Sequence, residues 1–370
     1  MILKNILLRE SLLCSLFCLV GLSVAIAQTK KYFNPLTDNA VQGRLEVLNS
    51  ASDYGRLPHA IQSSVREAVW HLGTNSAGLY VEFQTEADSI QVCYKVKHGL
   101  NMPHMPTTGV SGVDLYSFDK SNKRWEWAFG QYQFKDTVTY NFNNIGVNKN
   151  HVYRLYLPLY NTVDWLEIGV AENKDFKFIK TQSKPIVVYG TSIAHGACAT
   201  RPGLAWTNIL GRSFPNEIIN LGFSGNGRLE QPLLDLINAE EAEAFILDCI
   251  PNLAITKSRS EAQLDSLITN AVKTLRMKHP NTPIILAEHS SAETPGFQNR
   301  HTMEEYGRSS KVTNATYQKL KKAGIKKLYF ISAKDFGLDI ESTVDYAHPN
   351  DIGMMKISHA YSEVLRTLLK

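Results

Sequence analysis

Residues 186–196 read IVVYGTSIAHG, an apolar run that ends in a serine between two glycines. Four apolar or aromatic residues in succession predict a buried strand, and the glycines permit the tight turn that follows it. Ser192 would then lie at the mouth of a sheet with its hydroxyl available as a nucleophile. A turn serine or a helix N-cap serine gives the same local pattern, so this segment alone leaves the role of Ser192 open.

The C-terminal half repeats this pattern of apolar runs, each separated from the next by an amphipathic stretch. Predicted strands cover residues 186–189, 217–221, 244–248, 283–287 and 327–331, and predicted helices cover 204–212, 230–238, 260–279, 306–323 and a last segment from 351. Such alternation predicts an α/β fold with a parallel sheet and helices on both faces. A sheet of this kind binds its ligand at the carboxyl ends of its strands.

The N-terminal half has a different pattern of apolar residues. Short runs of β-branched and aromatic residues at 79–83, 90–94, 152–157 and 165–170 are separated by Gly, Asn, Asp or Pro, and no strong helical period interrupts them. This spacing is typical of a β-sandwich. We therefore expect a sandwich domain over residues 28–175 and the α/β domain over 184–370, joined by a polar segment.

The first 27 residues have the three parts of a secretory signal. Lys4 and Arg9 precede an apolar run over 11–26, and Ala25-Ile26-Ala27 form a small-residue cleavage site. The pattern predicts export to the periplasm or the extracellular space. No later stretch reaches the roughly 18 to 20 apolar residues that a membrane span needs, so we expect no membrane association after cleavage.

The charge and the cysteine content argue against a nucleic-acid-binding protein and against a small disulfide-bonded fold. The whole chain has 39 basic and 35 acidic residues, a balance too small and too evenly spread to predict nucleic-acid binding. Only Cys93, Cys198 and Cys249 follow the predicted cleavage site, which is too few for a disulfide scaffold. The chain must fold on its apolar core.

Two further loops follow predicted strands of the parallel sheet. Residues 220–227 read NLGFSGNG, a glycine-rich turn able to direct a backbone N–H at a bound oxygen, and residues 248–252 read DCIPN, which brings the amide of Asn252 to the same edge. Each is also an ordinary loop sequence. Their predicted position at the same edge of the sheet as Ser192 favours a catalytic role for both loops.

Residues 345–351 read DYAHPND and precede the last predicted helix. A histidine needs an acceptor on one ring nitrogen to fix its tautomer while the other nitrogen takes a proton from serine, and Asp345 and His348 supply both partners in one loop. An ordinary exposed loop remains the alternative. An N-cap role for Asn350 or Asp351 would explain part of the segment without any chemistry.

The order of these four blocks resembles the SGNH hydrolase family, also called GDSL-type esterases and lipases, over residues 184–370. The resemblance implies Ser192 as nucleophile and Asp345 and His348 as its partners. It also implies an oxyanion hole made by the N–H groups of Ser192 and Gly225 and the amide of Asn252. Two blocks depart from the usual pattern: Gly-Asp-Ser-Leu reads GTSI at 190–193, and Gly-x-Asn-Asp reads IPNL at 250–253.

The family resemblance implies a flavodoxin-like three-layer fold with strand order 2-1-3-4-5. In that order Cys198 and Cys249 follow neighbouring strands, so a disulfide stays open as an alternative to two buried thiols. Upstream, residues 112–116 read GVDLY and resemble the Gly-x-Asp-Leu-Tyr motif of a domain that precedes some exported SGNH hydrolases. We expect Asp114 to be a structural hydrogen-bond acceptor.

We therefore expect an exported serine esterase that needs no cofactor or metal and removes short acyl groups, most simply acetyl, from carbohydrates or other small alcohols. A thioesterase or lysophospholipase with the same triad is the enzymatic alternative. A non-catalytic glycan-binding protein is the alternative from another class, and the intact site residues count against it. The oligomeric state stays open.

Four other histidines have less definite roles. His195 is expected to line the pocket or pack locally, and His289 either touches substrate or is a plain loop histidine. His98 and His104 bracket a loop rich in Met and Pro, where a metal site lacks a third and a fourth ligand. That loop is either a mobile surface loop or one that leans over the catalytic rim and shapes the leaving-group pocket.

Overall fold

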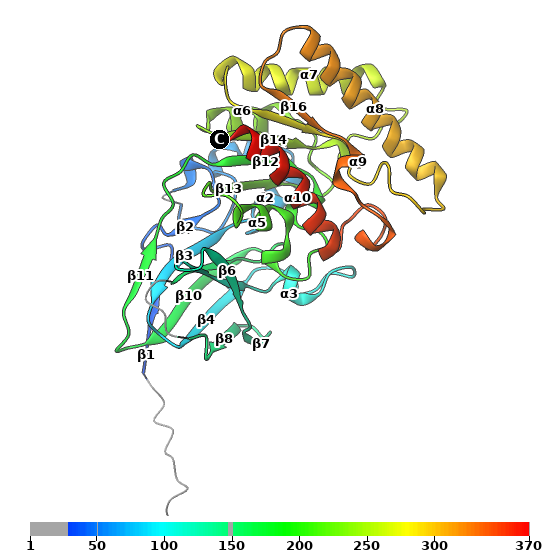
Figure 1. Cartoon of the computed structure of the whole chain (residues 1–370). Helices are drawn as coiled ribbons and strands as arrows, with labels where there is room; N and C mark the ends of the chain where they lie inside the picture. Colours follow the sequence, from blue (N-terminus) through cyan, green and yellow to red (C-terminus); the bar gives the residue numbers. More distant parts are fainter. Residues whose placement is uncertain (1–28, 50, 147–150, 370) are drawn as a thin grey trace, which may run out of the picture.

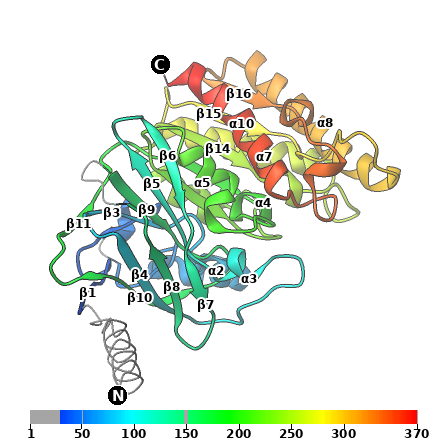
Figure 2. The same cartoon turned by 60° about the horizontal axis from the view of Figure 1, so that its bottom comes forward.

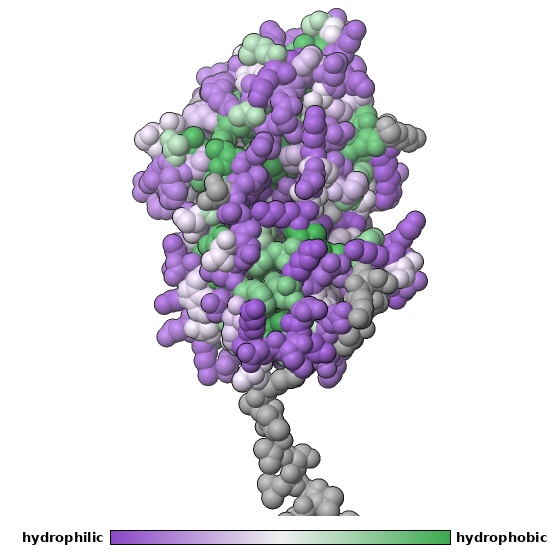
Figure 3. Space-filling model, turned by 90° about the vertical axis from the view of Figure 1, so that its left-hand side faces the viewer, coloured by the Kyte–Doolittle hydropathy of each residue, from purple (hydrophilic) through white to green (hydrophobic). Residues whose placement is uncertain are grey.

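The computed structural model describes residues 29–49, 51–146 and 151–369 and shows two layered halves (Figure 1). The predicted signal segment, 1–27, lies outside the described residues. Within the described part, no helix is long and apolar enough to cross a membrane. Figure 3 shows that hydrophilic side chains cover most of one face, with apolar side chains gathered in patches.

The N-terminal half is a β-sandwich of two antiparallel sheets, as the spacing of its short apolar runs predicts. One sheet has the order β1 (Lys30–Phe33), β10 (Val163–Ala171), β4 (Ser89–Val96), β8 (Val138–Asn143), β7 (Gln131–Gln133). The other has the order β11 (Phe176–Ile179), β3 (Tyr80–Thr85), β9 (His151–Tyr156), β5 (Asp114–Asp119), β6 (Arg124–Ala128), with β2 (Val41–Gln42) beside β3. Inward-facing residues of both sheets form one core.

Two features of this half differ from the prediction. The polar segment after residue 171 contains β11, because Phe176 and Phe178 pack inward and Phe176 stacks on Phe33 and Phe83. The sandwich therefore extends to Ile179, beyond the expected boundary at 175. Short helices also occur, at η1 (Glu46–Leu48), η2 (His59–Ser64), α2 (Glu67–Gly73) and α3 (Thr107–Val110), each too short to produce a helical period.

The C-terminal half is a parallel sheet with the predicted order 2-1-3-4-5. Its strands in spatial order are β13 (Ile218–Gly222), β12 (Ile186–Gly190), β14 (Ala244–Asp248), β15 (Ile284–Ala287) and β16 (Leu328–Ile331). The helical segments are α4 (Ser192–His195), η3 (Pro202–Leu204), α5 (Trp206–Gly211), α6 (Gln231–Ala239), η4 (Ile250–Asn252), α7 (Glu261–Lys278), α8 (Arg300–Lys322), α9 (Ala333–Phe336), η5 (Ile340–Ser342) and α10 (Asp351–Leu368).

Side-chain alternation along the strands divides the core between two faces. Val187 and Tyr189 of β12 pack in a cluster with α6 and α7, whereas Ile186 and Val188 pack in a cluster with α5 and α10. Helices thus cover both faces, as the sequence predicts. The carboxyl ends of β12, β13 and β14 remain free to carry functional side chains at one rim.

Buried polar contacts join the two halves. The Arg56 guanidinium donates to the carbonyl oxygens of Asn75 and Leu72 at 2.9 and 2.7 Å, and to those of Asn220 and Gly222 in the parallel sheet at 3.0 and 2.9 Å. Because Arg56 is fully buried, these four acceptors replace the water it loses. The sandwich is therefore tied directly to the strand beside β12.

Candidate active site

Ser192 lies where β12 turns into the single-turn helix α4. Thr191 is the N-cap, and its hydroxyl accepts the N–H of Ile193 at 3.4 Å, while Gly196 ends the helix in the left-handed conformation at φ 118°. The turn is tightly enclosed: a Cβ at Gly222 would collide with the backbone of His195, and one at Gly227 with the carbonyl of Gly190. The enclosure holds the Ser192 hydroxyl at the rim of the sheet.

The structure brings Ser192, His348 and Asp345 together in one chain of hydrogen bonds. The Ser192 Oγ lies 2.8 Å from His348 Nε2, and His348 Nδ1 lies 2.8 Å from Asp345 Oδ2. With the proton on Nδ1 donated to the carboxylate, Nε2 is left as the acceptor for the serine hydroxyl. This geometry is what base-assisted attack by serine requires.

Asp345 is fixed by its own loop. Its Oδ1 accepts the backbone N–H groups of His348 at 2.8 Å and Ala347 at 3.2 Å. Partial burial alone would raise the pKa of Asp345, but the hydrogen bonds from His348 and from this backbone outweigh it and hold the pKa below its usual value. Asp345 therefore stays ionised beside the imidazole.

The loop is also anchored at the start of α10. Asn350 caps that helix, its Oδ1 accepting the N–H of Gly353 at 3.1 Å, and Asp351 accepts the N–H and the hydroxyl of Thr200 at 2.9 and 2.6 Å. The predicted N-cap role of Asn350 is confirmed. It accompanies the Asp345–His348 pair and does not replace it.

Gly225 and Asn252 occupy the loops after β13 and β14. Gly225 adopts φ 68°, a conformation in which a side chain would be strained. Asn252 Oδ1 accepts the N–H of Gly227 at 3.1 Å, which orients the amide and leaves its NH₂ group as a donor. Their role in an oxyanion hole stays a prediction.

Replacing Asn252 with alanine is expected to lower kcat for a simple ester by roughly 10² to 10³, because one oxyanion donor is lost from the transition state. KM should change little, since the ground-state carbonyl carries less charge. Steady-state kinetics of the variant, beside Asn270→Ala on the exposed side of α7, test this. A rise in KM with an unchanged kcat would contradict the oxyanion role.

Two family models match the chain. The GDSL-like lipase/acylhydrolase model covers residues 183–366, and the GxDLY model, described as the N-terminus of SGNH hydrolase-type esterases, covers residues 30–176. A solved structure described as a GDSL-like lipase from Bacteroides ovatus ATCC 8483 is 32% identical, with a TM-score of 0.81 over 92% of this chain and 98% of that chain. The chain belongs to the GDSL-like lipase/acylhydrolase family.

Membership makes the chain an ester-hydrolysing serine hydrolase, as its sequence predicts. Two structures of lower identity share the fold. The salicylyl-acyltransferase SsfX3 is 18% identical, with a TM-score of 0.72 over 92% of this chain and 97% of that chain. A family two carbohydrate esterase from Cellvibrio japonicus is 12% identical, with a TM-score of 0.52 over 92% of this chain and 98% of that chain. Among curated proteins, none matches by sequence.

In this GDSL-like hydrolase His195 is a core residue. It is fully buried, its Nε2 lies 2.7 Å from the carbonyl oxygen of Leu159, and its ring stacks on Tyr160 at 4.2 Å. Burial and the nearby Arg56 charge hold the pKa of His195 well below its usual value, so the ring is neutral. Of the two expectations for His195, pocket lining and local packing, its burial favours local packing.

His289 is also buried and packs behind the catalytic loop. Its ring stacks on Tyr306 at 3.6 Å, and its Nδ1 accepts the N–H of Ser291 at 3.1 Å. Burial first, and the neighbouring His348 second, lower the pKa of His289 to about 3. With 2% of its surface exposed, His289 is a buried residue of the loop after β15, and this burial disfavours contact with substrate.

The sequence analysis missed Tyr346, which lies between Asp345 and His348. Its φ is 78°, in the left-handed region that side chains rarely adopt. Tyr306 stacks on it at 5.3 Å, and Phe297 meets its ring edge-on at 4.0 Å. These contacts hold the conformation that sets the spacing of the Asp345–His348 loop, and no local sequence signal predicts them.

The loop around His104 leans over the catalytic rim, as one of the two expectations held. The His104 ring lies 5.9 Å from the His348 ring, and the neighbouring Met105 is buried in the core of the α/β half. In Figure 2 α3 and the cyan loop beside it lie below α4. The Thr108 hydroxyl donates to the carbonyl of Thr200 at 2.7 Å, which fixes this segment to the hydrolase half.

Cys198 and Cys249 are free, buried thiols, so the disulfide alternative is wrong. Cys249 Sγ donates to the Tyr189 carbonyl at 3.4 Å. Burial and the nearby Asp345 charge raise the pKa of Cys198 to about 12. Neither thiol is a nucleophile at neutral pH.

Asp114 of the GVDLY segment is a structural acceptor, as expected. Its carboxylate accepts Trp127 Nε1–H at 2.7 Å, Arg201 Nη1–H at 2.6 Å and the N–H of Gly203 at 2.9 Å. Burial raises the pKa of Asp114 despite the Arg201 charge. The motif therefore joins the sandwich to the loop before α5.

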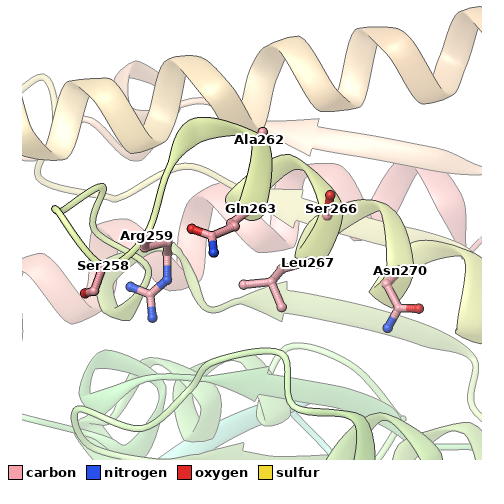
Figure 4. Close-up of a pocket in the computed structure, with 7 residues that line it drawn as sticks. All are labelled: Ser258, Arg259, Ala262, Gln263, Ser266, Leu267 and Asn270. Carbon is pink, nitrogen blue, oxygen red and sulfur yellow. The ribbon is translucent and has the colours of Figure 1, made fainter.

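A separate groove of about 580 Å³ runs along the first turns of α7 (Figure 4). Arg259, Gln263, Leu267 and Asn270 face the same open space, and none of its seven lining residues belongs to the four sequence blocks. The groove therefore shares no residue with the Ser192 site and is formed by α7 and the loop that precedes it.

Proposed function

We propose that this hydrolase removes short acyl groups, most simply acetyl, from a carbohydrate or another small alcohol outside the cytoplasm. The hydrogen-bond chain from Ser192 through His348 to Asp345 carries the proposal. Export is inferred from residues 1–27, and N-terminal sequencing of the exported protein, with Gln28 expected first, tests that part.

In the first half-reaction, the Ser192 Oγ attacks the ester carbonyl while His348 Nε2 takes the hydroxyl proton. Asp345 stabilises the imidazolium, and the N–H groups of Ser192 and Gly225 with the Asn252 amide receive the oxyanion. The tetrahedral intermediate then expels the alcohol, which leaves with the proton from His348. The acyl group stays on Ser192.

In the second half-reaction, water gives a proton to His348 and attacks the acyl-enzyme carbonyl. Collapse of the second tetrahedral intermediate returns that proton to Ser192 Oγ and releases the acid. No group besides the chain's own side chains and water is needed to balance either step.

The small acyl group is supported by the packing beside Asn252. Ile250, two residues before it, and Leu253, directly after it, are 3% and 0% exposed, and both belong to the core cluster that contains residues of α6 and α7. A long acyl chain on this side would have to displace core side chains, at a cost of several kcal/mol. The His104 ring lies 5.9 Å from the His348 ring and limits the space there.

A chain-length series of p-nitrophenyl esters, from acetate to palmitate, tests the proposal. The value of kcat/KM is expected to be highest for acetate and to fall by about tenfold or more at octanoate, because the longer chain meets buried residues. A long-chain optimum would favour the lysophospholipase or thioesterase alternative. An inactive, folded wild type, tested also on acetylated sugars, would favour the glycan-binding alternative.

A further inference from the structure

The segment from β6 to β7, which passes from one sheet of the sandwich to the other, places three aromatic side chains at the surface. Trp127, Phe129 and Tyr132 are 49%, 62% and 51% exposed, although each is large and apolar. They border a cavity of about 180 Å³ whose inner wall includes Tyr140 and Phe142. Exposed apolar groups that cluster around a hollow are typical of a ligand site and not of a free surface.

Trp127 is held rigidly in spite of its exposure. Asp114, a buried carboxylate, accepts its Nε1–H at 2.7 Å, and the Arg201 guanidinium lies 4.4 Å above its ring. Phe129 meets the Trp127 ring edge-on at 6.1 Å. A restrained ring loses little conformational entropy when a ligand packs on it, so the arrangement is pre-organised for binding.

The charges at the cavity indicate an uncharged ligand. Its only charged lining residues are Asp114 and Arg201, which pair at 2.6 Å and cancel. Thr108, Thr200 and Tyr132 also line the cavity, so uncharged polar residues lie among the aromatic ones. A neutral sugar ring matches this lining, because its C–H faces pack on aromatic rings and its hydroxyls bond to polar groups at the edge.

The cavity is linked to the catalytic loop through a short segment of the hydrolase half. Thr200 and Arg201 line the cavity, Thr200 is bonded to Asp351, and the N–H of Cys198 donates to the carbonyl of Pro349 at 2.8 Å. Pro349 directly follows His348. Segment 198–201 therefore touches both the cavity and the loop that carries the base.

We propose that this cavity is a subsite for a neutral sugar ring in the alcohol part of the substrate. The assignment rests on the proposed function in naming that alcohol a glycan. Glycan binding, however, can be measured without catalysis. The GxDLY-type domain then does more than support the hydrolase: it holds the carbohydrate while Ser192 attacks its ester.

Calorimetric titration of the full mature chain with unacetylated oligosaccharides tests the subsite. The probes are cellohexaose, xylohexaose and mannohexaose, with an oligogalacturonate as the acidic comparison. The variants are Trp127→Ala and Phe129→Ala, and the matched control is Tyr32→Ala, an exposed aromatic on β1 outside the cavity. Thermal unfolding of each variant checks its fold.

We expect at least one neutral oligosaccharide to bind the wild type and the Tyr32 variant alike, and each cavity variant to bind it about tenfold more weakly. If one cavity variant fails to fold, the other decides. No binding of any neutral oligosaccharide, equal binding by all variants, or tighter binding of the oligogalacturonate would overturn the subsite. Hydrolysis of p-nitrophenyl acetate, measured in parallel on the wild type, reports on the proposed function alone.

Discussion

Ser192→Ala is expected to lower kcat for p-nitrophenyl acetate by about 10⁴ to 10⁶, because the variant has no nucleophilic oxygen beside His348 Nε2. The loss should appear in kcat and in kcat/KM equally, since the nucleophile acts in the transition state. Initial rates over a range of substrate concentrations measure both constants.

Ser362→Ala is the matched control for this variant, because Ser362 is a serine of similar burial on α10. The control should retain activity within a few-fold, and both variants should unfold at temperatures close to that of the wild type. Residual activity within tenfold of the wild type in Ser192→Ala would remove Ser192 from the mechanism.

Asp345→Asn is expected to lower kcat by about 10⁴, with little change in the fold. The amide oxygen can still accept the N–H groups of Ala347 and His348, so the loop keeps its bonds. The amide NH₂, however, then faces His348 Nδ1 and favours the tautomer whose Nε2 carries the proton. In that tautomer His348 cannot accept the proton of Ser192.

Asp351→Asn separates this effect from a general loss of charge near His348. Asp351 is the first residue of α10, directly after the loop, and its partner is Thr200 and not a histidine. Its variant should lose only a few-fold in kcat. Equal losses in the two variants would show that Asp345 supports the loop and does not set the histidine tautomer.

The parallel sheet could be predicted because its signal is periodic and repeated, whereas the order of its strands was implied by the family resemblance. Each strand of the α/β half is a short apolar run, and the residues with chemistry follow the runs at Ser192, Gly225 and Asn252. Since parallel strands end at one edge, sequence position alone places these residues on one rim. The Asp345–His348 pair was predictable because both members lie in one loop.

The sandwich was predicted in outline, although several of its strands were missed. β8 carries a clean alternation, with Val138, Tyr140 and Phe142 buried and the residues between them less buried. That signal was present in the sequence and is a reliable one. β11 was hidden because it has only four residues within a polar segment, and its core contacts come from Phe176 and Phe178 meeting strands distant in sequence.

Contacts between the halves were beyond prediction from the sequence. His104 meets His348, and Asp114 meets Arg201, through pairs of residues separated by long stretches of chain. The same limit applies to His195 and His289, whose burial involves Tyr160 and Tyr306 packing over them. Local sequence places a histidine at the rim of a sheet but does not determine what covers it.

The most direct test of the account is covalent labelling of the mature enzyme with diisopropyl fluorophosphate, followed by intact mass and peptide mass spectrometry. We predict one adduct per chain, located on Ser192, with activity lost in proportion to labelling and no adduct on Ser192→Ala. An enzyme that hydrolyses esters but is labelled at another residue, or remains active without Ser192, would contradict the assignment of Ser192 as nucleophile.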